Sequence, residues 1–290
     1  MALLLIKAII SGMLVGMVYA LIGAGLNIIY GVMRVVNFAH GDFLKLAAYI
    51  TYWLSVLYGI DPLASLLIII PLFFILGVVI YYWTVPRLLK SEDPEIASYL
   101  AYFGIALIIN SGIIIGWGGD PRGVPCPFKV ASISTGGIHL PTGRLIAFAV
   151  CLIITLALTL FLYRTYYGKA IRAVIQNRDA VQLLGINMNK ISAISFGIGL
   201  TLAGTAGTLV VLVFPAIAPG MGTSYTTIAF VAIVLGGLGS PLGAVLGGLI
   251  YGLAENISAV FIPTALSPVI AFIILIITVM IKPQGLLART

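Results

Sequence analysis

One short stretch, RVVNFAHGDFLK at residues 34–45, carries side chains that could do chemistry between two long apolar runs. It brings an amide, an imidazole and a carboxylate together at Asn37, His40 and Asp42. Two interpretations stay open. The stretch is either an interfacial turn, whose charges pair with each other and with lipid headgroups, or a gate on a transport pathway. In a gate, Asn37 and His40 would hydrogen-bond across a helix bundle and Gly41 would allow a bend, with Asp42 beside them.

A second stretch, RTYYGKAIRAVIQNRDAVQLLGINMNK at residues 164–190, holds six charged side chains, five of them basic. Apolar residues recur at helical spacing up to Ile175 and then stop. Asn177 suits the N-cap of a second short helix and Gly185 its C-cap, with Asp179 favourably placed in the first turn. The pattern predicts two short helices joined near Asn177.

The second of these helices would offer a small apolar knob, made of Ala180, Val181 and Leu184 and edged by Arg178 and Gln182. A compact helical knob favours docking into a groove of a cytosolic partner. The alternative is an amphipathic turn that lies on lipid headgroups.

Motifs for catalysis are missing from the sequence. It has no HExxH zinc motif, no phosphate-binding GxxxxGK[ST] loop and no paired carboxylates within an apolar run. We therefore predict that the chain is not an enzyme and binds no cofactor or metal. If ATP drives its function, another polypeptide must bind the nucleotide.

Composition assigns the chain to membrane proteins. Of its 290 residues, 61% are hydrophobic and only 8% are charged, with a mean hydropathy of +1.20. A soluble domain carries about 25% charged residues. The net charge of +7 comes from Lys and Arg in loops between apolar runs, which indicates positive-inside topology and not nucleic-acid binding. We predict an all-α integral membrane protein, a polytopic helical bundle in contact with lipid.

The apolar runs divide into eight to ten transmembrane spans, with nine the best interpretation. Short spans broken by Gly and Pro indicate broken or re-entrant helices. Small residues every four positions, as at Gly239, Gly243 and Gly247, predict close helix packing. All 290 residues are expected to form a single transmembrane domain. The expected spans are 8–32, 46–60, 63–85, 96–118, 145–163, 191–213, 227–239, 241–261 and 264–281.

Loop charge predicts the orientation of the bundle. The basic excess of 164–190 places that loop in the cytoplasm, because charges near the bilayer centre are costly and basic loops stay inside. Alternation then makes 119–144 an external loop. The stretch 34–45 falls toward the cytoplasmic side.

Four stretches carry a resemblance to a known family. GKAIRAVIQNRDAVQLLGI (168–186) resembles the cytoplasmic coupling loop of the branched-chain amino acid ABC transporter permeases. YALIGAGLNIIYGVMRVVNFAHGDF (19–43), VAIVLGGLGSPLGAVLGGLIYGLAE (231–255) and the tail KPQGLL (282–287) are similar to the same family. Its members usually carry Glu where this chain has Asp42, which keeps the charge and shortens its reach.

The resemblance implies a permease subunit of an ATP-driven importer, in the plasma membrane of a prokaryote. Its partners would be two cytosolic ABC ATPase subunits that bind ATP and Mg²⁺, a second homologous permease and an extracytoplasmic solute-binding protein. Leu, Ile and Val are the family's usual solutes, although other amino acids, amides or urea stay open, as does an ion-coupled secondary transporter that needs no ATPase. The residues carried over to the ATPase-coupling element are Arg172, Asn177, Asp179, Ala180, Leu183 and Gly185.

Overall fold

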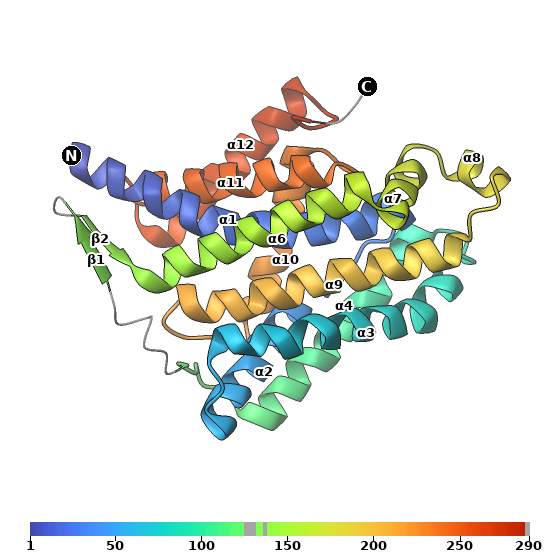
Figure 1. Ribbon diagram of the computed structural model, residues 1–290. Coiled ribbons are helices and arrows are strands. Elements are labelled where there is room, and N and C mark those ends of the chain that lie inside the picture. The colour runs from blue at the N-terminus through green and yellow to red at the C-terminus, as the bar shows by residue number, and fades with distance from the viewer. Residues whose placement is uncertain (125–131, 136–137, 288–290) are drawn as a thin grey trace.

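The computed structural model describes residues 1–124, 132–135 and 138–287, and the described chain is almost entirely helical (Figure 1). A two-stranded antiparallel hairpin, β1 (Ser132–Thr135) and β2 (Ile138–Pro141), is the exception. The helices are α1 (Ala2–Met33), α2 (His40–Tyr58), α3 (Pro62–Leu88), α4 (Pro94–Trp117), α6 (Thr142–Arg164), α7 (Tyr166–Gln176), α8 (Arg178–Leu183), α9 (Met188–Val213), α10 (Met221–Gly236), α11 (Pro241–Ser258), the 3-10 turn η1 (Thr264–Leu266) and α12 (Ser267–Ile281).

Each of the nine predicted spans overlaps one of these helices, which confirms a polytopic helical membrane protein. Within the described residues, six helices are long and apolar enough to cross a membrane alone. The pair α10 and α11 bends by 116° at its break and forms either one broken span or a re-entrant loop. Local signals set the boundaries: Asp61 caps α3 and Asp93 caps α4, each just before a proline at the first helical position.

The helical bundle has two opposite ends (Figure 1). The N-terminus and the β1–β2 hairpin lie at one end, whereas α7 and α8 lie at the other. The core is built on α1 and α9: 89% of the apolar window of α9 and 61% of that of α1 are buried, against 11% for α12. Helices that are apolar all round yet exposed are typical of lipid-facing positions. The outer helices α3, α4, α6 and α12 therefore present apolar faces to lipid.

Glycines let the central helices approach closely. A Cβ on Gly248 of α11 would lie 2.3 Å from the Ala20 backbone nitrogen of α1, and one on Gly247 would lie 2.0 Å from the Ala232 carbonyl oxygen of α10. Gly243 packs in the same way on Gly236. Gly239 lies outside the helix of these two, in the break after α10 with a φ of 79°, yet its Cα lies 3.0 Å from where a Cβ on Gly31 of α1 would be.

Candidate functional site

The first candidate site begins where α2 starts inside the bundle. After α1 ends, residues 34–39 run without regular structure and α2 begins at His40. The His40 Nε2 atom lies 3.2 Å from the Ile22 carbonyl oxygen of α1. Ile22 is 11 residues before Met33, which is about 16 Å along a helix. The start of α2 is therefore buried deep in the protein, and the expected second span begins six residues earlier than predicted.

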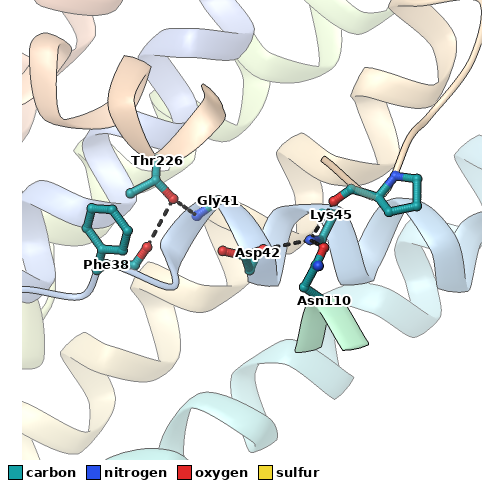
Figure 2. A network of polar contacts seen from close by, with 7 residues as sticks. Phe38, Gly41, Asp42, Lys45, Asn110 and Thr226 are labelled. Atoms are coloured by element: carbon teal, nitrogen blue, oxygen red, sulfur yellow. Dashed lines mark hydrogen bonds and ion pairs between the residues drawn. The ribbon is translucent and has the colours of Figure 1, made fainter. Parts of the chain in front are cut away.

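A buried ion pair lies in the first turns of α2. Lys45 Nζ is 2.7 Å from Asp42 Oδ1, and these side chains are only 1% and 7% exposed. Lys45 also donates to the Asn110 Oδ1 atom of α4 and to the Pro219 carbonyl oxygen, each at 2.8 Å (Figure 2). Three acceptors match the three N–H donors of an ammonium group. Full satisfaction of the ammonium group reduces the cost of removing the charge pair from water.

The start of α10 packs directly on the start of α2. The Gly41 N–H donates to Thr226 Oγ1 at 2.9 Å, and that hydroxyl donates to the Phe38 carbonyl oxygen at 3.1 Å (Figure 2). A Cβ on Gly41 would lie 2.1 Å from the Gly222 carbonyl oxygen. Gly41 thus permits close contact between two helices. It lies in the first turn of α2 without a positive φ, and the bend expected of it in a gate stays a prediction.

Three buried polar side chains in this region have atoms without hydrogen-bond partners among the described residues. These are both amide atoms of Asn37, the Nδ1 atom of His40 and the Oδ1 atom of Asn27. The expected hydrogen bond of His40 across the bundle is present, but the one expected of Asn37 is not. An unsatisfied buried polar group costs about 1–3 kcal/mol. Each such group therefore calls for an explanation.

The structure thus unites Asn37, His40, Gly41 and Asp42 around the start of α2. Asp42 pairs with Lys45 inside the protein, whereas Arg34 of the same stretch is exposed, so both interpretations of residues 34–45 stay predictions. Lys45 follows Asp42 at a spacing that faces one side of a helix, so the pair could have been found from the sequence. Asn110 and Thr226 could not, because each lies in a distant apolar run and gives no local signal.

The second candidate site is the loop that contains α7 and α8, and both helices form as predicted. Asn177 caps α8: its Oδ1 atom accepts a hydrogen bond from the Ala180 N–H at 3.0 Å. Gly185 follows α8 with a φ of 75°, in the left-handed region that favours glycine. Asp179 lies in the first turn of α8.

The knob on this loop differs in composition from the prediction. Val181 is buried and provides the apolar contact that attaches the six-residue α8 to the bundle. Leu183 and Leu184 are instead 89% and 78% exposed, beside the exposed Ala180. Arg172 stands apart from this surface: its guanidinium lies 4.1 Å from the centre of the Tyr163 ring, and its Nε donates to the Leu162 carbonyl oxygen at 2.9 Å. Arg172 therefore attaches α7 to the end of α6.

Known proteins match this chain over nearly its full length. A family profile described as "Branched-chain amino acid transport system / permease component" matches residues 8–279. The high-affinity branched-chain amino acid transport system permease protein BraD of Pseudomonas aeruginosa is 29% identical over 295 residues, covering 98% of this chain and 96% of BraD. A probable branched-chain amino acid transport permease protein LivH of Methanocaldococcus jannaschii is 28% identical over 297 residues, covering 97% of this chain and 92% of LivH.

A more distant relative is the ribose import permease protein RbsC of Escherichia coli. It is 29% identical over 168 residues, covering 56% of this chain and 52% of RbsC. No solved structure gives a significant match.

Proposed function

The chain belongs to the permease-component family of branched-chain amino acid transport systems, and we propose that it is the membrane-spanning subunit of an ATP-driven importer for branched-chain or related hydrophobic amino acids. It is a multi-pass protein of the plasma membrane. The substrate class follows the relatives' names.

The exposed apolar surface on α8 is the observation that carries the ATP-driven part of the proposal. The α8 helix lies at the end of the bundle opposite the β1–β2 hairpin (Figure 1). Leu183 at its end and the following Leu184 are not covered by the described chain. Apolar side chains held on a capped helix, next to basic residues, suit a groove on a soluble partner. The sequence has no phosphate-binding loop, so that partner would supply the ATP and Mg²⁺ site.

The buried cluster at the start of α2 is the proposed gate. The ion pair and its acceptors tie α2 to α4 and to the segment before α10, and the Gly41–Thr226 contact ties α2 to α10. A pathway closed by a few polar contacts can open when one helix shifts, because the released groups gain water or solute as partners. The side-chain atoms of Asn37 and His40 that lack hydrogen-bond partners belong to the same segment, at the start of α2.

The assembly we propose has two copies of the permease fold, this chain and a homologous second permease. Two cytosolic ABC ATPase subunits would bind the α7–α8 loop. An external solute-binding protein would deliver the solute to the opposite side, where we place residues 119–144, although 125–131 and 136–137 lie outside the described residues. All of residues 1–290 would form one transmembrane domain.

Purification with the ATPase subunits tests this assembly. The chain is expressed with its own membrane partners, and the proteins that co-purify in mild detergent are identified. Leu183→Asp should remove the ATPase, because a carboxylate would enter an apolar contact, and Ala180→Glu should do the same. Gln176→Asp, at an exposed position on α7 outside the knob, is the matched control. Equal ATPase recovery with all three variants would refute docking through α8.

A secondary transporter is the second candidate, because a broken pair such as α10–α11 is also typical of that class. It predicts that the purified chain alone moves solute across liposome membranes along an ion gradient. The importer predicts no uptake without ATPase subunits and ATP.

A further inference from the structure

The break between α10 and α11 is a tight turn: the Gly237 N–H still donates to the Ile233 carbonyl oxygen at 2.8 Å, and the Ser240 N–H donates to the Gly237 carbonyl oxygen at 3.2 Å. Residues 237–240 turn the chain by 116°, with positive φ at Gly237 and Gly239. The Asn27 amide of α1 donates to the Gly237 carbonyl oxygen at 3.0 Å. This break, the α10–α11 joint, is thus fixed to α1. Gly237 and Gly239 have no side chains, so a neighbouring residue can approach their backbone.

Ile175, in the last turn of α7, is that neighbour. Its Cγ2 atom lies 3.1 Å from the place where a Cβ on Gly239 would be, and its Cγ1 atom lies 3.3 Å from the corresponding place on Gly31 of α1. Both glycines therefore let the Ile175 side chain pack closely against the backbone of α1 and of the break. Isoleucine suits such a notch because its branched Cβ restricts the side chain to few rotamers.

The C-terminal tail holds the joint from a second side. The N–H groups of Leu286 and Leu287 donate to the carbonyl oxygens of Leu235 and Gly236, at 2.9 and 3.0 Å. These are carbonyls in the last turn of α10, which would otherwise lack partners. Gly285 allows this approach, since a Cβ there would lie 2.5 Å from the Gly237 backbone.

The opposite end of α10 belongs to the buried polar cluster. Gly222 and Thr226 contact Gly41, and a Cβ on Gly222 would lie 2.3 Å from Asp42 Oδ1. One uninterrupted helix of 16 residues therefore joins the notch around Ile175 to the proposed gate. Rigid secondary elements are among the structures that can carry coupling between distant sites.

We propose that Ile175 is a positioning residue that fixes α7 to the α10–α11 joint, so that a displacement of the α7–α8 loop moves α10 and releases its contacts with Gly41 and Asp42. This inference rests on the proposed function. Ile175, Gly31 and Gly239 would move together as one unit. The contact between Ile175 and Gly31 would therefore persist throughout the transport cycle.

The test uses the complete transporter, with its ATPase and binding-protein subunits, in proteoliposomes. Solute uptake and ATP hydrolysis are measured together for the wild type, Ile175→Ala and Ile175→Val. We expect Ile175→Ala to lower the solute moved per ATP by about tenfold while hydrolysis continues. Ile175→Val keeps the branched Cβ and should restore the ratio. Ile186→Ala, which removes the same volume elsewhere in the loop, should leave the ratio unchanged.

An unchanged ratio in Ile175→Ala would overturn the inference. Absence of ATP-dependent uptake by the wild type would instead overturn the proposed function, so the two failures are distinguishable.

Discussion

Lys45 and Asp42 form an ion pair of 2.7 Å in which both side chains are almost completely buried, at the start of a helix that begins inside the bundle. A charge pair in an apolar core is stabilising only when its remaining donors and acceptors are also satisfied. Here Asn110 and Pro219 complete the partners of Lys45. The pair therefore links three segments that are far apart in the sequence, and its opening would release all three.

Removing one member of the Asp42–Lys45 pair should lower the stability of the protein much more than removing both. Lys45→Met leaves the Asp42 carboxylate buried without its cation, and we expect a loss of about 3–5 kcal/mol of stability. The double variant Asp42→Asn with Lys45→Met should recover part of this lost stability. Thermal unfolding in detergent compares the single and the double variant, and Lys90→Met at an exposed position is the control. A single variant as stable as the control would contradict the buried pair.

Gly41→Ala should disrupt the contact between α2 and α10. The new methyl group would lie 2.1 Å from the Gly222 carbonyl oxygen and 2.4 Å from the Thr226 nitrogen, both of which are backbone atoms. Overpacking of this kind costs about 1–3 kcal/mol, and uptake should fall with it. Gly112→Ala in α4 is the matched control, because nothing beyond its chain neighbours and its own helix backbone lies within 4 Å of its Cβ position. Wild-type uptake in Gly41→Ala would rule out the close contact.

Asn177→Ala should weaken α8 without harming the rest of the bundle. The lost cap is worth about 1 kcal/mol, which matters for a helix of six residues. We expect faster amide hydrogen exchange confined to α8, together with reduced ATPase recovery. Asn177→Asp restores an acceptor oxygen and should behave like the wild type. If exchange in α8 is the same in Asn177→Ala and Asn177→Asp, the cap does not hold the helix.

Gly248→Val should separate α11 from α1. Its Cβ position is 2.3 Å from the Ala20 nitrogen, so the backbones would have to move apart. We expect a thermal transition at lower temperature and poor yield of folded protein. Gly116→Val, with nothing within 4 Å, should behave normally. Equal melting of the two variants would mean that α1 and α11 tolerate a wider separation.

Much of the fold could be predicted because its signals are local. Long apolar runs predict helices in lipid, and the prolines after Asp61 and Asp93 mark where two of them begin. The caps of α8 were likewise visible, since Asn177 and Gly185 act on their own backbone. These features need no knowledge of distant contacts.

The rest of the candidate site depends on contacts between segments far apart in the chain. No local pattern shows that Asn110 meets Lys45, or that Thr226 meets Gly41. For the same reason Val181 was misplaced on the exposed knob, because which face of α8 is covered depends on the bundle below it. Gly239 was assigned to a helix stripe by spacing alone, whereas its backbone conformation puts it in a turn.

Uptake into proteoliposomes is the most direct test of the central claim. The chain is reconstituted with its second permease and ATPase subunits, and radiolabelled leucine is supplied with the external binding protein. An ATP-driven importer should accumulate leucine only when ATP is present on the side of the membrane that the ATPase subunits face. Leu183→Asp should abolish this accumulation. Uptake that proceeds equally without ATP and without the ATPase subunits would contradict ATP-driven import.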